Sequence, residues 1–158
     1  MIVLRYPVSI NVVKKLKCND VVKYSGKLVL LSEESLKKLV SYKELEGSYP
    51  YDLIGEIVLT AYWKEFPIFF NPSEEFLESI FSMGAVGVIL ELCERNLSIL
   101  RKLSRVVFKP LDEVKGSVRE VLYKELGEKA LREIWVDGIN LKVILDSKGK
   151  YVKSEVKG

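Results

Sequence analysis

Three apolar runs of strand length constrain the fold of this chain more than any other feature. They span residues 56–62, 85–90 and 105–108, and Pro110 closes the last one. The segments before and between these runs place apolar residues at helical spacing, which predicts amphipathic helices. The predicted helices cover residues 33–45, residues 73–84 and residues 94–103. Strands that alternate with helices are typical of an α/β fold, in which helices pack on a sheet.

Further strands are expected toward both ends of the chain. Residues 20–24 and 27–31 flank Ser25-Gly26, and we expect two strands joined there by a bend. Residues 131–136 and 141–145 flank Asp137-Gly138 in the same way. Hairpins at both ends predict a mixed sheet with flanking helices. The remaining predictions are a strand or arm at residues 2–6, a helical turn or two at 9–17, a strand at 67–70, a mostly helical segment at 117–130 and a short last strand from Tyr151.

Length and composition indicate one folded unit. The chain has 158 residues, and we expect residues 1–158 to form a single domain. Apolar residues make up 48% and charged residues 30%, which is the profile of a globular protein rather than a disordered one. No apolar run reaches the roughly 18 residues that a membrane span needs, and the start of the chain lacks the basic beginning of a signal peptide. We therefore expect a cytoplasmic protein with no membrane partner.

Missing residue types exclude several kinds of chemistry. The sequence contains no His and no Gln, and its one Thr is Thr60. Without His, a Ser-His-Asp triad is impossible, and the commonest general base and metal ligand are absent. Cys18 and Cys93 form no CxxC pair, so we expect reduced thiols, no metal site and no iron–sulfur cluster held by this chain alone. The abundance of Lys and Glu, with no Gln, is typical of thermophile proteins.

The charge of the chain is concentrated in one segment. The net charge is +3, and residues 138–158 account for it with five Lys against Asp146 and Glu155. The other 137 residues balance at 20 basic and 20 acidic side chains, so no basic face for a phosphate backbone is evident. We interpret the Lys-rich segment as a solvated end and expect no nucleic-acid partner. Nucleic-acid binding through this segment is kept as a third hypothesis.

Three segments resemble a known family. Residues 16–26 (LKCNDVVKYSG) resemble the LKVGDVVYLSG segment in the β subunit of class I fumarate hydratases and L-tartrate dehydratases. Residues 128–136 (EKALREIWV) and residues 143–150 (VILDSKGK) resemble two later segments of that subunit, EALWKIEVEDFP and VVIDSKGN. The order and spacing suit one domain from about residue 5 to residue 152. The resemblance implies a swivelling β/β/α domain.

The family's catalytic motifs are replaced in this chain. Lys27 stands where a Thr follows the SG of the family, and Ser32, Glu33 and Leu36 stand where the family has Arg, Asp and His. Only the basic pair Lys37-Lys38 is kept. The nearest remnant of the later GPTTSxRM motif is 71–73 (NPS), and 90–93 (LELC) replaces the GKG. The resemblance places the ancestral cleft at Gly26, Lys27, Ser32, Lys37, Lys38, Asn71 and Ser73, with no catalytic residue assigned.

These replacements predict that this chain alone is inactive, although the family is one of hydro-lyases. An Arg binds a carboxylate bidentately, which Ser and Leu cannot do, and losing one such donor costs about 100- to 1000-fold in rate. The resemblance implies a partner α subunit that carries a [4Fe–4S] cluster, a homo-oligomer, or both. The first hypothesis is an accessory subunit of such a hydro-lyase. The alternative is a non-catalytic paralogue that binds another protein or a small acid.

Overall fold

The sheet of this protein is mixed and closes on itself. The computed structural model describes residues 1–66 and 68–158, apart from the side chain of Glu65. Within the described residues the sheet has seven strands in the order β1-β2-β3-β4-β5-β7-β6, and β2 also pairs with β7. The strands are β1 (Ile2–Arg5), β2 (Val21–Leu30), β3 (Ile57–Leu59), β4 (Gly87–Ile89), β5 (Val106–Pro110), β6 (Ser117–Leu122) and β7 (Leu131–Leu145).

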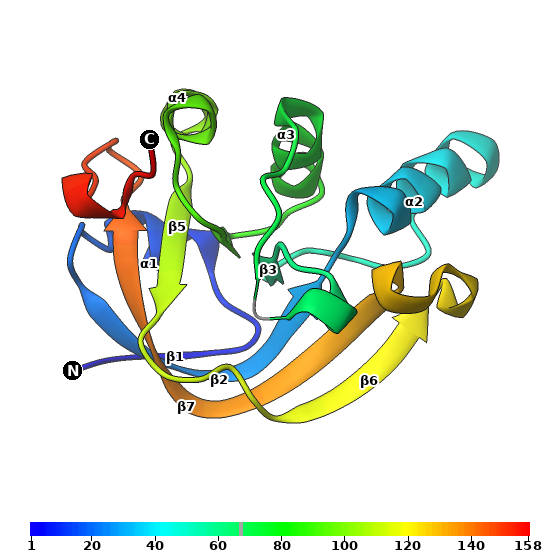
Figure 1. Ribbon diagram of the computed structural model, residues 1–158, viewed down its shortest axis with the longest axis horizontal. Helices are drawn as coiled ribbons and strands as arrows, with labels where there is room; N and C mark the ends of the chain where they lie inside the picture. Colours follow the sequence, from blue (N-terminus) through cyan, green and yellow to red (C-terminus); the bar gives the residue numbers. More distant parts are fainter. Residues whose placement is uncertain (67) are drawn as a thin grey trace.

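Strand direction divides the sheet into a parallel part and an antiparallel part. β2, β3, β4 and β5 run parallel to one another, whereas β7 runs antiparallel to both β5 and β2. Five strands therefore form a closed ring of neighbours, with β1 beside β2 and β6 beside β7 at the free edges. Figure 1 shows three helices on one side of the short strands and the long, curved β2, β7 and β6 on the other.

Local capping signals fix the helices. These are α1 (Ile10–Lys15), α2 (Glu33–Glu46), α3 (Glu74–Ser82) and α4 (Glu94–Leu103), with short 3-10 turns at η1 (Trp63–Glu65), η2 (Lys124–Lys129) and η3 (Lys153–Glu155). Ser32 caps α2 by accepting from the Ser35 N–H, and Ser73 caps α3 by accepting from the Phe76 N–H. Acidic residues fill the first turns, where the helix dipole favours negative charge. In the described part of the chain, no helix combines the length and apolarity needed to cross a membrane.

Alternation along the strands separates two apolar cores. Leu28 and Leu30 of β2 join the cluster that fills the ring, together with side chains of β7 such as Ile134. Val29 and Leu31 point to the other face and join the cluster under the helices. This is the period of two expected of a strand buried on both faces. The predicted α/β class, with a mixed sheet and flanking helices, is confirmed.

The predicted hairpins at the two ends are wrong. Residues 21–30 form one continuous strand, as do residues 131–145. Tyr24 pairs with Ile139 and Gly26 pairs with Val136, so Ser25 lies opposite the two residues Asp137-Gly138. The Ser25 hydroxyl accepts from the Gly138 N–H at 2.9 Å. The residues that resembled two turns are therefore the two sides of one β-bulge, which bends the strands without ending them.

Three shorter segments also differ from the prediction. Residues 117–130 are not mostly helical, because β6 occupies 117–122 and only the 3-10 turn η2 follows. The predicted strand at residues 67–70 is reduced to an isolated bridge between Phe69 and Ala61, and Pro67 lies outside the described residues. Tyr151 likewise makes a single bridge, with Leu145. By contrast, α4 has the predicted bounds of 94–103.

Candidate functional site

Three helices begin at the same edge of the sheet. α2 follows the carboxyl end of β2, α3 follows that of β3 after a connecting loop, and α4 follows that of β4. Their N-cap residues are Ser32, Ser73 and Cys93. In open α/β sheets, ligands bind outside the carboxyl ends of the strands, where helix N-termini present backbone N–H groups. This carboxyl edge is therefore the first place to look for a site.

The N-terminus of α3 already holds an anion, which is a carboxylate of the chain itself. The Ser73 backbone N–H donates to Glu33 Oε2 at 2.9 Å, and the Ser73 hydroxyl donates to Glu33 Oε1 at 3.0 Å. Glu33 lies in the first turn of α2, so one helix supplies the anion that the next helix binds. A substrate carboxylate would have to displace Glu33 from this position, because both oxygens are already bound.

Ser32, Lys37 and Lys38 surround the start of α2. The Ser32 hydroxyl donates to the Lys129 carbonyl at 2.7 Å and is thereby fixed to η2. Lys37 lines an open groove of about 630 Å³ between α2 and α3, together with Ser73. Lys38 lies outside this groove and pairs with Glu125 at 3.3 Å, an exposed contact of little energetic weight. Of these three side chains, Lys37 is the one that lines the groove.

Asn71 belongs to the N-terminus of α4 rather than to the groove. Its Oδ1 accepts from Asn96 Nδ2 at 3.2 Å, and its Nδ2 donates to Cys93 Sγ at 3.4 Å. Asn96 is buried and also accepts from the Cys93 N–H at 2.8 Å. This small network holds the loop after β4 against the segment before α3.

Gly26 and Lys27 lie at the opposite, amino end of the parallel strands. Lys27 Nζ is 3.0 Å from Glu133 Oε2 and 3.2 Å from Glu56 Oε2. The Tyr51 hydroxyl donates to Glu133 Oε2 at 2.6 Å. The rings of Tyr6 and Tyr51 lie 4.9 Å and 5.1 Å from the ammonium. Lys27 is 9% exposed and Glu56 is 0% exposed, so this is a buried charge cluster inside the protein.

The two carboxylates of this cluster are unequal. Burial raises the pKa of Glu56 to about 7, against a partial lowering by Lys27. Neither Glu56 oxygen accepts a hydrogen bond from the described residues. Lys27 Nζ, which lies 3.2 Å from Glu56 Oε2, forms an ion pair with it. For Glu133, burial also acts to raise the pKa, but hydrogen bonds from Tyr51 and Lys27 outweigh it and leave the pKa below its ordinary value.

The structure therefore separates the seven predicted residues. Lys37 and Ser73 line the groove, and Ser32 and Lys38 contact η2. Asn71 lies at the start of α4, and Gly26 and Lys27 lie at the buried cluster. Glu56 and Glu133 were not singled out from the sequence. A signal was present, because Glu56 opens the apolar run 56–62 and Lys27 opens a strand of otherwise apolar residues. A charged residue at the entrance of a buried strand needs a partner of opposite sign.

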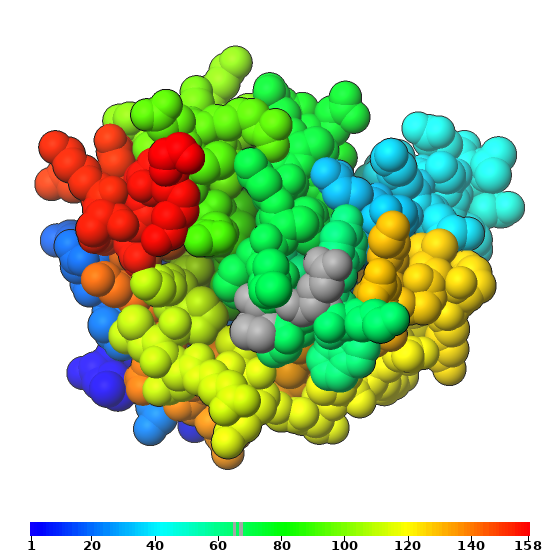
Figure 2. Space-filling model, viewed as in Figure 1, coloured from blue at the N-terminus to red at the C-terminus, as the bar shows by residue number. Residues whose placement is uncertain are grey.

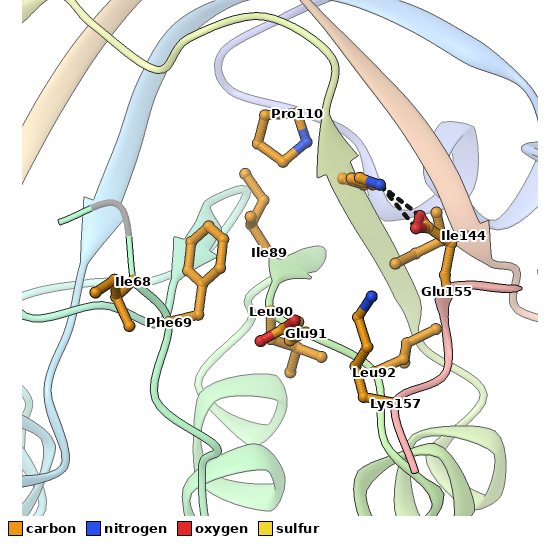
Figure 3. A pocket seen from close by; sticks show the side chains of 11 residues that line it. Ile68, Phe69, Ile89, Leu90, Glu91, Leu92, Pro110, Ile144, Glu155 and Lys157 are labelled. Carbon is orange, nitrogen blue, oxygen red and sulfur yellow. Dashed lines mark hydrogen bonds and ion pairs between the residues drawn. The ribbon is translucent and has the colours of Figure 1, made fainter.

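A second hollow at the carboxyl edge lies over the ends of β4 and β5. It has a volume of about 340 Å³ and is shown in Figure 3. Four charged side chains reach it: Glu91, Lys109, Glu155 and Lys157. A smaller hollow of about 160 Å³ continues it toward Asn71 and Cys93. This pocket leaves no pattern in the sequence, because the segment 151–157, which forms one wall, meets the ends of β4 and β5 only in the folded chain. In Figure 2 this last segment lies against α4 on the surface.

No family model and no curated protein matches this chain.

Proposed function

We propose that this protein is a non-catalytic, β-subunit-like partner of an iron–sulfur hydro-lyase α subunit. The layers of helices, short parallel strands and long antiparallel strands suit a swivelling β/β/α domain, which is the fold implied by residues 16–26, 128–136 and 143–150. The [4Fe–4S] cluster would belong to the α subunit, where an open iron acts as a Lewis acid. This chain would supply contact surface and cover for that site.

One observation carries the non-catalytic part of the proposal. The hydrogen bonds from Ser73 to Glu33 occupy the N-terminus of α3, the position at this edge best suited to a substrate carboxylate. Of the three predicted lysines, Lys27 is committed to two buried carboxylates at the far end of the strands and Lys38 pairs with Glu125, which leaves Lys37 at the groove. A dicarboxylate would therefore find the helix N-terminus and two of the three lysines occupied by groups of the protein itself.

Co-expression with the α-type subunit from the same genome tests the proposal. We expect the two chains to purify together and the complex to hydrate fumarate or dehydrate tartrate, whereas this chain alone is inactive. Failure to form a complex, or hydratase activity of this chain alone at an enzymatic rate, would contradict the proposal. Capture of an unrelated protein from native extract in place of the α subunit would favour the paralogue hypothesis.

A matched pair of variants locates the contact surface. Lys37 is exposed at the groove between α2 and α3, and Lys14 is exposed in the last turn of α1. If the carboxyl edge faces the α subunit, Lys37→Glu weakens co-purification and Lys14→Glu does not. Equal effects of the two substitutions would argue against docking through this edge.

A further inference from the structure

The pocket over β4 and β5 combines an apolar floor with charged walls. Ile89, Leu90, Leu92 and Ile144 form the floor, and each is at most 4% exposed. Phe69 and Pro110 border the space above it, as Figure 3 shows. The volume of about 340 Å³ lies at the small end of the range of about 300–1,000 Å³ that is usual for small-molecule sites. The floor thus suits a small ligand with one apolar group.

Two of the four charged side chains in the pocket are committed to each other. Lys109 Nζ donates to both oxygens of Glu155 at 2.7 Å, which ties β5 to residues 153–155. The backbone N–H of Lys157 donates to the Leu92 carbonyl at 2.8 Å and fixes the last wall of the pocket. These contacts preorganise the pocket without using its remaining charges.

The other two charged side chains, Glu91 and Lys157, form no ion pair among the described residues. Both are exposed, and they reach the same space from adjacent segments of backbone. In Figure 3 the side chains of Lys157 and Glu91 both border the hollow. The pocket therefore presents one uncommitted cation and one uncommitted anion at the rim of an apolar floor.

We propose that this pocket binds a free α-amino acid with an apolar side chain. The ligand carboxylate would pair with Lys157, its ammonium with Glu91, and its side chain would lie on Ile89 and Leu92. The four charged side chains of the pocket are two positive and two negative, which favours a ligand of zero net charge over a dicarboxylate. This inference uses residues outside the groove and does not depend on the proposed partner subunit.

Titration of the intact chain with a set of related probes tests this inference. L-leucine is compared with 4-methylpentanoate, which lacks the ammonium, with 3-methylbutylamine, which lacks the carboxylate, and with glycine and succinate. We expect L-leucine to bind with a dissociation constant on the order of 1 mM, because the ligand is small and the charge pairs are exposed. Each probe should bind more weakly, and backbone amide NMR signals of residues 91–93 and 157 should shift with L-leucine.

Charge-removing variants separate the two contacts. Lys157→Gln should weaken L-leucine by about two- to fivefold and leave 3-methylbutylamine unchanged, since an exposed ion pair is worth about 0.2–1 kcal/mol. Glu91→Gln should weaken L-leucine similarly and leave 4-methylpentanoate unchanged. Lys153→Gln and Glu94→Gln are the matched controls, because both residues are exposed and lie outside the pocket. Absence of saturable L-leucine binding, tighter binding of succinate, or indifference to both pocket variants would overturn the proposal.

Discussion

Replacing Glu56 with Gln should stabilise this protein at neutral and alkaline pH, even though it removes one partner of a buried ion pair. Glu56 is 0% exposed, and burial raises its pKa to about 7 from an ordinary value of 4.5. The folded chain therefore holds a proton that the unfolded chain releases between these pH values. The free energy of unfolding falls as the pH rises through this window, and the loss is complete above pH 7.

The difference between the pKa of Glu56 in the folded chain and its ordinary pKa sets the size of the stability change. Ionisation of Glu56 lowers the free energy of unfolding by about 3 kcal/mol. Gln resembles the protonated acid in shape and carries no charge at any pH. Glu56→Gln should therefore be more stable than the natural chain by up to about 3 kcal/mol at pH 8 and should show little difference at pH 4.5.

Glu133, the second carboxylate of the buried cluster, provides the matched comparison, because its ionised form stabilises the fold whereas that of Glu56 destabilises it. Hydrogen bonds from Tyr51 and Lys27 leave the pKa of Glu133 below its ordinary value despite burial, so its charged form stabilises the fold. That contribution is present above the ordinary pKa and is lost as the pH falls through the lowered one. Glu133→Gln should therefore cost about 1.5–3 kcal/mol at pH 8, which is typical of hydrogen bonds to a charged group.

Urea unfolding at half-unit steps from pH 4.5 to pH 8, followed by circular dichroism, measures both variants against the natural chain. The reasoning predicts that the curve of Glu56→Gln is flatter between pH 4.5 and pH 7 and that the two variants lie on opposite sides of the natural chain at pH 8. A Glu56→Gln protein that is less stable at pH 8, or that keeps the natural slope, would refute it.

Three further substitutions test separate parts of the structure by the same unfolding assay. Glu33→Gln should lower the free energy of unfolding by about 1–2 kcal/mol, because it weakens the hydrogen bonds from Ser73 to the carboxylate at the start of α3. The control is Glu74→Gln, an exposed residue in the first turn of α3, which should cost under about 0.5 kcal/mol. Equal losses in stability would contradict the role of the Glu33 carboxylate. Gly26→Ala should cost more than about 2 kcal/mol, because φ is +141° and a Cβ would collide with Tyr6. In the control Gly47→Ala, φ is +86° and no atom lies within 4 Å of the new Cβ, so the cost should be about 1 kcal/mol. Lys27→Met should cost about 3–5 kcal/mol by leaving two carboxylates buried without a cation, and a loss under about 1 kcal/mol would show that the cluster is solvated.

The parts of the fold that the sequence predicts correctly are those with local causes. Ser32 and Ser73 stand immediately before acidic first turns and cap α2 and α3, two of the helices predicted at residues 33–45 and 73–84. Residues 117–130 are predicted to be mostly helical, but their first part is the strand β6. It is a strand because β7 pairs with it along its length, while its own first four side chains stay exposed. Pairing with a neighbouring strand, rather than burial of its own side chains, makes this segment a strand, and such pairing leaves no apolar pattern in the segment itself.

The candidate site was harder to predict than the fold, because its contacts join distant segments. Glu33 lies in the first turn of α2, where a local argument pairs it with the dipole of its own helix, but its carboxylate accepts hydrogen bonds from Ser73, forty residues later. Lys27 meets Glu133 across 106 residues of chain. Spacing in the sequence can place residues on one face of one element, but it does not say which elements meet.

The bulge between β2 and β7 shows how the sequence resemblance to the hydro-lyase β subunit can reflect a shared backbone without shared catalytic residues. A one-residue change of register turns every side chain of a strand to the other face. If β7 continued past Ile139 in the register of the Tyr24–Ile139 pair, with no bulge, Glu133 would pair with Leu30 and point into the apolar ring, and Ile134 would lie on the same face as Lys27. Residues 16–26, 128–136 and 143–150, which carry the resemblance to the hydro-lyase β subunit, lie in or next to β2 and β7. The likeness is therefore concentrated at the seam that closes the ring, where it constrains the backbone, and it does not extend to the carboxyl edge, where the two sites proposed above lie.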